Sequence, residues 1–352
     1  MSAGAVRTGI AMLRAGRPVR IGGREALAVL AVETATQELL NVLDVKRCAK
    51  LLISGQRSAA LNLSNERDAA DPAAPVLLAH ADWLDATTAL AIADPGRDLD
   101  RPPIGPLHPI AAECAEAARA ALDLARSAGL LPALWLLDPN VADLSVSIDN
   151  IVSERRQPTV EIVARAKLPL EDMPPTQIVA FRASDDGQEH VALVVGAFGG
   201  KPRLVRLHSE CLTGDVFGSL KCDCGPQLHE ALHIIGNAGG GVLLYLRQEG
   251  RGIGLVNKIR AYSLQDRGFD TVDANRRLGF ADDERDYGHA AAMLRALGID
   301  KVRLLTNNPN KVKGLEGAGI KVAERVAHQM PANPHNADYL GTKRKRSGHL
   351  LI

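Results

Sequence analysis

The apolar positions near the start of the chain recur mainly at helical spacing. Two Ala- and Leu-rich stretches, AVRTGIAMLRAG (5–16) and ECAEAARAALDLARSAGLLP (113–132), therefore predict amphipathic helices. The apolar face of the second helix consists of Ala117, Ala121, Leu124 and Ala128. Gly129 follows this face and is a typical C-terminal stop signal. Short apolar runs at 76–81 and 133–138 predict strands between these helices.

The pattern changes in the segment between residues 140 and 175. This segment is more charged, loses the alanine bias of the preceding chain and ends in Met-Pro-Pro. A length of 352 residues suits two domains better than one. We therefore expect a first domain over residues 1–157 and a second over residues 158–352.

Beyond this junction, strand and helix patterns alternate. Strands are predicted at 190–198, 201–210, 241–248, 301–309 and 321–326, and helices at 226–240, 254–268, 282–299 and 311–320. The helix at 226–240 places Leu228, Ala231, Leu232 and Ile235 on its apolar face. The helix at 254–268 does the same with Leu255, Ile259 and Tyr262. The alternation predicts an α/β fold of mixed α+β type, with a mixed sheet and helices in the second domain.

Composition and charge narrow the class of protein. Hydrophobic residues make up 46% of the chain and charged residues 24%, as in ordinary globular proteins. The net charge of +1 argues against a general nucleic-acid or membrane-surface role. The first twenty residues place arginines among the apolar positions, unlike a signal peptide. We therefore expect a cytoplasmic protein, in which clustered cysteines are typically metal ligands or catalysts.

Three of the five cysteines lie in CLTGDVFGSLKCDCG (211–225), and thiolates suit zinc. Cys211, Cys222 and Cys224 allow two interpretations. In a closed structural site, His208 or His229 is the fourth ligand. In an open site, water takes the fourth position and becomes a strong nucleophile near neutral pH. The cysteine spacing does not choose between them, but anion-binding features on either side favour the open site.

The main anion-binding feature is RQEGRGIGLVNK (247–258), which follows a predicted strand and opens a predicted helix. Its alternating glycines, Gly250, Gly252 and Gly254, let backbone N–H groups approach a phosphate. The alternative is an ordinary glycine-rich turn. The motif is neither the dinucleotide fingerprint nor a P-loop.

Further polar residues are spread along the second domain. Asp283 and Arg285 fall in the first turn of the helix predicted at 282–299, where acids also simply complement the helix dipole. Thr306, Asn307 and Asn308 end a predicted strand, which is where α/β sheets often meet ligands. The scattered cations are solvated charges unless they converge to clamp phosphates; they are Arg206, Lys221, Arg260, Arg285 and Lys311.

Taken together, four stretches resemble the motifs of the GTP cyclohydrolase II family: 206–225, 243–275, 278–291 and 302–312. The resemblance covers roughly residues 160–352. It implies an enzyme that converts GTP to 2,5-diamino-6-ribosylamino-4(3H)-pyrimidinone 5′-phosphate, formate and pyrophosphate. This reaction is the first committed step of riboflavin biosynthesis.

The resemblance also implies roles for individual residues. Cys211, Cys222 and Cys224 bind one zinc ion per subunit, and Mg²⁺ accompanies the GTP triphosphate. The residues that contact GTP are Arg206, Leu207, His208, Ser209, Glu210, Gln227, Glu249, Gly250, Arg251, Thr271, Thr306 and Lys311. The catalytic residues are Tyr262 beside the base, Asp283 as proton acceptor and Arg285 as the nucleophile at the α-phosphorus. A homodimer without a nucleic-acid or membrane partner is expected.

Two of these roles are also open to chemical reasoning. Guanine offers N1–H and an exocyclic amine as donors, and Glu249 is a candidate carboxylate to accept from them. A nucleophilic arginine is chemically awkward, because guanidinium stays protonated in proteins. Arg285 therefore has a second interpretation, as a charge clamp for the transition state.

The first domain resembles 3,4-dihydroxy-2-butanone 4-phosphate synthase in residues 11–21 and 120–138. The acidic loop that holds Mg²⁺ in that family is replaced by GGREALAVL (22–30). Its HTEA motif is replaced by Ala117-Ala118-Arg119-Ala120. Alanine and leucine side chains cannot hold a divalent ion. We therefore expect a degenerate domain without synthase activity, kept for stability, dimerisation or regulation.

Two other functions compete with the enzyme. A zinc-stabilised regulatory module would bind GTP without turnover, but it would need to lack a catalytic residue, and Tyr262, Asp283 and Arg285 are all present. A zinc-knuckle nucleic-acid binder fits poorly with 3% aromatic residues and a net charge of +1.

Overall fold

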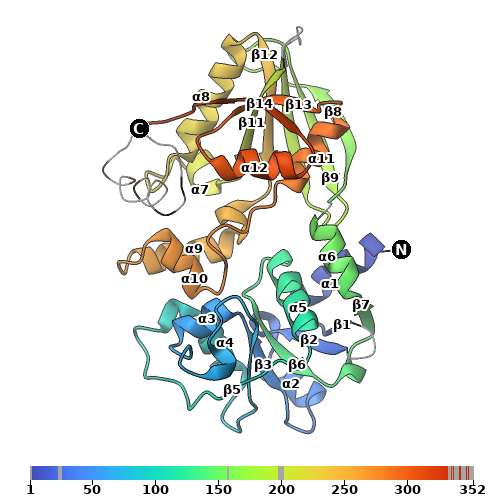
Figure 1. The fold of residues 1–352 in the computed structure, drawn as a ribbon, viewed down its shortest axis with the longest axis vertical. Helices are drawn as coiled ribbons and strands as arrows, with labels where there is room; N and C mark the ends of the chain where they lie inside the picture. The colour runs from blue at the N-terminus through green and yellow to red at the C-terminus, as the bar shows by residue number, and fades with distance from the viewer. Residues whose placement is uncertain are drawn as a thin grey trace. The chain divides into compact units, whose positions relative to one another are not determined.

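The computed structural model describes residues 2–22, 26–156, 158–196 and 202–331, together with 334, 336, 341, 346 and 348. Its contacts define two compact units, each built around a seven-stranded sheet (Figure 1). The first unit comprises Met1–Glu154 and Val256–Glu284, and the second Arg155–Leu255 and Arg285–Ile352. No helix among the described residues is both long and apolar enough to cross a bilayer.

The sheet of the first unit has the strand order β5-β4-β3-β6-β2-β1-β7 and is antiparallel except where β1 meets β7. Its strands are β1 (Val19–Ile21), β2 (Leu27–Ala31), β3 (Lys50–Ile53), β4 (Val76–Leu78), β5 (Pro109–Ile110), β6 (Ala133–Leu137) and β7 (Leu144–Val146). Its helices before residue 157 are α1 (Ser2–Arg14), α2 (Gln37–Leu43), α3 (Gly55–Ala60), α4 (Ala86–Ala93), α5 (Ala115–Ser127) and α6 (Ile148–Arg156). Short 3-10 turns lie at Val32–Thr34, Arg67–Ala69, Pro95–Arg97 and Pro139–Val141.

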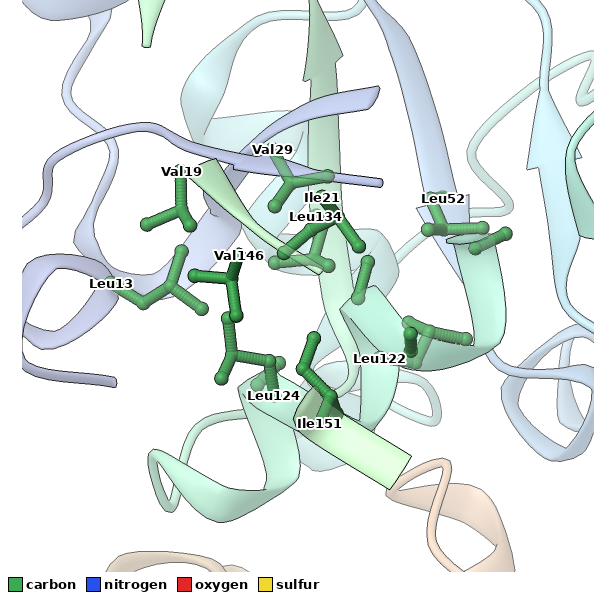
Figure 2. Close-up of a cluster of buried hydrophobic side chains, with 14 of the residues drawn as sticks. Leu13, Val19, Ile21, Val29, Leu52, Leu122, Leu124, Leu134, Val146 and Ile151 are labelled. Carbon is green, nitrogen blue, oxygen red and sulfur yellow. The ribbon is translucent and has the colours of Figure 1, made fainter. Parts of the chain in front are cut away.

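The core of the first unit forms where α1 and α5 pack against this sheet. Leu13 of α1 and Leu124 of α5 lie beside Val19 and Val146 of the strands, and Val29 belongs to the same cluster (Figure 2). The predicted face of α5 is confirmed, since each of its four apolar residues is at most 5% exposed. Gly129 follows α5 with φ +73°, a left-handed conformation that glycine adopts without strain. Hydrophobic periodicity therefore located this core correctly.

The sheet of the second unit has the order β14-β13-β11-β12-β10-β9-β8. Its strands are β8 (Val160–Lys167), β9 (Thr176–Ala183), β10 (Glu189–Gly196), β11 (Arg203–Ser209), β12 (Gly240–Leu246), β13 (Lys301–Leu305) and β14 (Lys321–Val326). β11, β12, β13 and β14 are parallel to one another, whereas β8, β9 and β10 add as antiparallel neighbours. A mixed sheet with helices in the second unit matches the prediction.

Helices cover both faces of this sheet. α8 (Cys224–Asn237) packs on one face through Ala231 and Ile235, with Leu228 and Leu232 beside them, as predicted. α11 (Gly288–Ala296) and α12 (Pro309–Gly317) cover the other face through Met293, Leu294 and Leu315, among others. The remaining helical elements of this unit are α7 (Leu212–Asp215) and the 3-10 turn η5 (Glu249–Gly252).

Residues 256–284, here called the inserted segment, interrupt the second unit in sequence but pack with the first. They contain most of α9 (Leu255–Gln265) and all of α10 (Thr271–Arg277). The predicted domains differ from the units in this assignment. The predicted boundary at 157/158 lies close to the division at 154/155 and stays a prediction, and Gln157 is outside the described residues.

The predicted apolar face of α9 is wrong. Leu255 and Ile259 are 39% and 49% exposed, and the buried residues are Asn257, Lys258, Ala261 and Leu264. The helix turns its more polar face inward because that face meets carboxylates and carbonyl groups of residues 1–154. Hydrophobic spacing cannot reveal a helix that packs through polar contacts.

The predicted start of the helix at 282–299 is also wrong. α11 begins at Gly288, so Asp283 and Arg285 precede it in non-helical chain. Carboxylates in this stretch bond the local backbone: Glu284 accepts from the Ala281 N–H, and Asp286 accepts from the Gly288 N–H. Such bonds compete with the helix. The macrodipole explanation for Asp283 therefore does not apply.

Candidate active site

The parallel strands of the second sheet end along one edge, where polar residues gather. β11 ends at Ser209, β12 at Leu246, β13 at Leu305 and β14 at Val326. The chain beyond each end supplies polar groups, including Thr306, Asn307 and Asn308 after β13. These three residues line a pocket. A crevice at the carboxyl ends of parallel strands is the usual ligand position in such sheets.

A pocket lies at this edge and brings together nine of the predicted site residues. They are Arg206, His208, Ser209, Cys224, Gln227, Arg251, Arg285, Thr306 and Lys311. The other residues that line it are Asp223, Asn307, Asn308 and His328. Of the five scattered cations, Arg206, Arg285 and Lys311 therefore converge on this pocket.

The three cysteines form one group at the start of two helices. Cys211 precedes α7, Cys224 begins α8, and Cys222 lies between them. Their three Sγ atoms all lie within 4.8 Å of one another, and those of Cys211 and Cys222 are 3.7 Å apart. A zinc tetrahedron with bonds of about 2.3 Å has sulfur–sulfur edges of about 3.8 Å. The three cysteines therefore have both the donor atoms and the spacing that zinc requires.

Two glycines give the thiols their room. A Cβ on Gly214 would come within 2.7 Å of the Cys222 Sγ atom, and one on Gly225 within 2.4 Å of the Gly214 carbonyl oxygen. The crowded thiols also share protons: hydrogen bonding with Cys211 raises the pKa of Cys222 to about 11. Neighbouring thiolates therefore need a cation to offset their repulsion, as a metal site would provide.

Asp215 organises the chain around Cys211, a role that its position in the sequence did not reveal. Its carboxylate accepts the Cys211 N–H at 3.0 Å, the Tyr245 hydroxyl at 2.9 Å and the His208 Nε2 atom at 3.1 Å. Burial lowers the pKa of His208, so its contact with Asp215 is a hydrogen bond from a neutral ring. The only available signal was a spacing of four residues from Cys211, which is shared by many helical turns.

Neither candidate histidine joins the cysteine group. His208 directs its Nε2 atom to Asp215, and His229 lies on the exposed face of α8. Within the described ranges, the group of ligand atoms that includes the three cysteines contains no further Asp, Glu or His. This favours the open interpretation of the site over the closed one.

Glu249 ties the glycine-rich turn to the cysteine loop. Its Oε2 atom accepts the Leu212 N–H at 2.7 Å and its Oε1 atom accepts the Gly250 N–H at 2.9 Å. Gly250 and Arg251 both adopt left-handed backbone, with φ of 63° and 64°. Arg251 is therefore held in a conformation that is unusual for a non-glycine residue, and its side chain lines the pocket.

Arg206 and Lys311 are buried cations that line the pocket. Arg206 donates to the Leu305 carbonyl at 3.1 Å and to the Gln227 Oε1 atom at 2.6 Å. Burial lowers the pKa of Arg206 to about 10, which still leaves it protonated at neutral pH. Lys311 donates to the Leu207 carbonyl at 2.6 Å. Two buried cations that are held by fixed hydrogen bonds and line the same pocket suit a phosphate group.

Leu207 and Glu210 are not among the residues that line the pocket. The Leu207 side chain is fully buried in the core beneath α11 and α12, so only its backbone faces this edge. Glu210 accepts the Arg247 Nε–H at 2.9 Å. Their predicted contacts with GTP stay predictions.

His328 lines the pocket, and no pattern in the sequence singled it out. It is 3% exposed, and neither ring nitrogen has a hydrogen-bond partner among the described residues. Asn307 fixes its backbone through two bonds, donating to the His328 carbonyl at 2.7 Å and accepting its N–H at 3.0 Å. Burial, followed by the charges of Arg206 and Lys311, lowers the pKa of His328 to about 3. The ring is therefore a neutral donor and acceptor beside the cations.

The remaining predicted residues, Tyr262, Thr271 and Asp283, lie in the inserted segment of the first unit. The Tyr262 ring lies 5.7 Å from the Lys258 Nζ atom. Thr271 begins α10 and accepts from the Gln265 side chain at 3.1 Å. Asp283 lines a groove of about 970 Å³ that residues 56–73 and 269–283 form within that unit.

Comparisons with known proteins cover the part of the chain that forms this edge. The family model described as GTP cyclohydrolase II matches residues 161–327. A protein named GTP cyclohydrolase-2 from Azospirillum brasilense is 43% identical over 366 residues, covering 99% of this chain and 94% of its own. The riboflavin biosynthesis protein RibBA of Bacillus cereus is 45% identical over 295 residues, covering 76% of this chain and 74% of its own.

Among solved structures, the chain is similar to RibBX, a two-domain 3,4-dihydroxy-2-butanone 4-phosphate synthase from A. baumannii. That match has 19% identity and a TM-score of 0.32, and covers 92% of this chain and 99% of the other. The TM-score is too low to support a conclusion about fold or function. The match to the Azospirillum protein, in contrast, spans the region of the first unit as well as the pocket.

Proposed function

Since the chain belongs to the GTP cyclohydrolase II family and is an enzyme of that family, we propose that it hydrolyses GTP at a zinc site. The products are formate, pyrophosphate and 2,5-diamino-6-ribosylamino-4(3H)-pyrimidinone 5′-phosphate. The observation that carries the proposal is a group of three thiols next to a pocket lined by Arg206, Arg251, Arg285 and Lys311. Thiolates call for a soft metal, and clustered cations call for phosphates.

The cations of the pocket bind the triphosphate of GTP. Arg206 and Lys311 are fixed by carbonyl groups of the neighbouring strands, so they present charge without losing further side-chain freedom on binding. Mg²⁺ is held largely by the phosphates themselves, as that ion prefers. His328 adds a ring N–H donor beside these cations. A phosphate oxygen would accept the hydrogen bond that this N–H group does not make within the described residues.

Formation of formate requires hydrolysis at C8 of guanine, first to open the imidazole ring and then to release the formyl group. When bound by three thiolates, zinc supplies the Lewis acidity that makes water a nucleophile near neutral pH. The chain's own contribution is rigidity: Asp215 fixes Cys211, and Glu249 fixes the turn at Leu212. Asp283 accepts the proton and Tyr262 lies beside the base, as the family resemblance implies.

Release of pyrophosphate requires a water molecule to attack the α-phosphorus, which leaves a 5′-monophosphate on the other product, and it requires stabilisation of the charge that develops there. Arg285 is one of four cations that line the pocket, and a guanidinium remains protonated at the pH of the cell. We therefore assign Arg285 to charge stabilisation rather than to nucleophilic attack. Such a clamp acts most strongly where charge develops in the transition state.

The products provide the test of this proposal. The purified full chain, loaded with zinc, is incubated with GTP and Mg²⁺, and formate and pyrophosphate are both quantified. We expect one formate and one pyrophosphate for each GTP consumed. A zinc-loaded chain that binds GTP without releasing formate would instead identify a nucleotide-binding regulatory module.

A further inference from the structure

We propose that residues 1–154, here called the N-terminal domain, position the inserted segment for GTP turnover and so serve as a non-catalytic part of the cyclohydrolase. This inference rests on the proposed function, because that function assigns Tyr262 and Asp283 of the segment to the reaction. It assigns a function to a domain in which the acidic loop and the HTEA motif of the synthase family are replaced. All of the contacts that support it lie within the first unit.

The strongest attachment is at α9. Arg260 pairs with Glu33 at 2.7 Å and with Asp94 at 2.9 Å, and all three side chains are largely buried. The same guanidinium donates to the Asn257 Oδ1 atom at 2.8 Å, and the Asn257 amide donates to the Gly129 carbonyl at 3.2 Å. Asn257 is completely buried. Two carboxylates and one carbonyl of the N-terminal domain thus fix the helix that carries Tyr262.

Further attachments lie along α10 and beyond it. Arg57, which is 1% exposed, is held by Asp98 through two bonds and donates to the Arg277 carbonyl at 3.3 Å. Arg126 lies 3.5 Å from Glu284, the residue that follows Asp283. Arg267 pairs with Asp100 at 2.6 Å. Contacts with the N-terminal domain therefore occur on both sides of Asp283 in the sequence.

The backbone of the inserted segment also approaches the N-terminal domain closely. Gly279 has φ +87°, and a Cβ there would come within 2.6 Å of the Ser54 Oγ atom and 3.3 Å of the Arg57 Cβ atom. Only glycine avoids both the strain and the collision. The N-terminal domain also forms one wall of the groove that Asp283 lines, through Gln56, Ala59 and Ala60.

The hydrophobic pattern of α9 explains why the segment depends on this surface. The helix exposes Val256 and Ile259 and buries Asn257 and Lys258 together with Ala261 and Leu264, so polar contacts share in setting its position. Hydrogen bonds and ion pairs are directional, whereas apolar contacts are not. Polar attachment therefore fixes the orientation of the segment, and small displacements of reacting groups can cost about a hundredfold in rate.

The test uses the full chain with Glu33→Gln and Asp94→Asn combined, which removes both charges facing Arg260 and leaves every proposed site residue in place. We expect kcat for formate release to fall by about tenfold or more, with KM for GTP and zinc content nearly unchanged. Amide hydrogen exchange should accelerate within residues 256–284 and stay unchanged in the second unit. The matched control is Asp143→Asn, an exposed carboxylate of the same domain that pairs with Arg17.

The two readouts separate the possible failures. Faster exchange in residues 256–284 with unchanged kcat would overturn the positioning role. Absence of formate from the wild-type chain would refute the proposed function instead. If the double variant loses protection throughout, Asp100→Asn, which removes only the peripheral pair with Arg267, replaces it. A parallel change in local exchange and kcat in that variant supports the inference, and a change in exchange alone overturns it.

Discussion

The pocket at the edge of the second sheet and the inserted segment of the first unit are held in place by different kinds of contact. The pocket residues are fixed by their own sheet: Arg206 and Lys311 donate to strand carbonyls, and Asp215 fixes Cys211. The inserted segment is fixed by side chains more than a hundred residues away, such as Glu33 and Asp94. The first region is built by its fold, whereas the second depends on a separate part of the chain.

Because the two regions are held differently, substitutions in them should change different properties of the enzyme. Substitutions in the pocket should remove metal or weaken GTP binding, because the groups concerned touch the ligand in the proposed function. Substitutions at the attachment of the inserted segment should lower turnover while binding survives. Kinetic constants and metal content measured together therefore distinguish the two regions.

The largest effect is expected for Cys222→Ser, which removes one thiolate from the metal group. Zinc content should fall to near zero and formate release by at least about a thousandfold, since the Lewis acid that would activate water is lost. The far-ultraviolet circular dichroism should stay close to that of the wild type. Cys48→Ser, at an exposed free cysteine, is the matched control. Global unfolding of the Cys222 variant would instead support a closed structural site.

Lys311→Met tests whether the buried cations that line the pocket bind phosphate. The methionine keeps most of the side-chain volume but loses the ammonium group that donates to the Leu207 carbonyl. We expect KM for GTP to rise by about tenfold or more, because a charge-assisted contact with phosphate is lost. Zinc content should not change. Lys313→Met, at the exposed position two residues along α12, should leave KM as it is; an equal rise in both variants would contradict a specific phosphate contact.

His328 allows a smaller effect to be measured with a defined pH dependence. His328→Ala should raise KM for GTP by about threefold to tenfold, the cost of one hydrogen bond, and His328→Asn should recover part of the loss. The pKa of His328 is lowered to about 3, so the ring stays neutral and the effect should be constant between pH 5 and 8. A loss in His328→Ala that changes across this range would show that a protonated ring binds the substrate.

The smallest effect is expected for a substitution of His289, which lies outside the pocket. This substitution tests a contribution to the unfolding free energy rather than to activity. Burial alone would lower the pKa of His289, but its 3.0 Å contact with Asp185 and the charges of Asp185, Asp286 and Asp186 raise it overall. His190, whose ring centroid lies 5.0 Å away, is neutral because burial lowers its pKa to about 3, and its Nδ1 atom accepts the Arg247 N–H at 3.1 Å.

A raised pKa means that this pair stabilises the folded state fully below pH 6.5 and less as the pH rises through the folded-state value. His289→Asn should therefore cost about 1 kcal/mol of unfolding free energy at pH 6 and less at pH 9. Urea unfolding at the two pH values measures this. A loss that grows with pH would contradict the assignment of a charged His289.

Much of the fold follows from local patterns that the sequence displays. The faces of α5 and α8 were predicted because these helices pack on sheets through apolar residues such as Leu124 and Ile235. The pocket was predictable in outline because strand ends in a parallel sheet share one edge, which brings Arg206 close to Thr306. The cysteine group was predictable because three thiols at short spacing are typical ligands of a soft metal.

The rest depends on contacts that one sequence does not display. The buried face of α9 is polar, and its partners Glu33 and Asp94 lie far away in the chain. The start of α11 is delayed by side-chain bonds to the backbone from Glu284 and Asp286. His328 enters the pocket because Asn307 holds its backbone across the gap between two strands. Tertiary partners of this kind override local propensity.

In the proposed reaction, guanine is opened at C8 at the edge of the second sheet. Incubation of the zinc-loaded full chain with [8-¹³C]GTP and Mg²⁺, followed by ¹³C nuclear magnetic resonance, tests this directly. We expect the label to appear as formate, and the Cys222→Ser chain to produce none under the same conditions. Label that remains in an intact guanine ring while GTP is bound by the wild-type chain would contradict it.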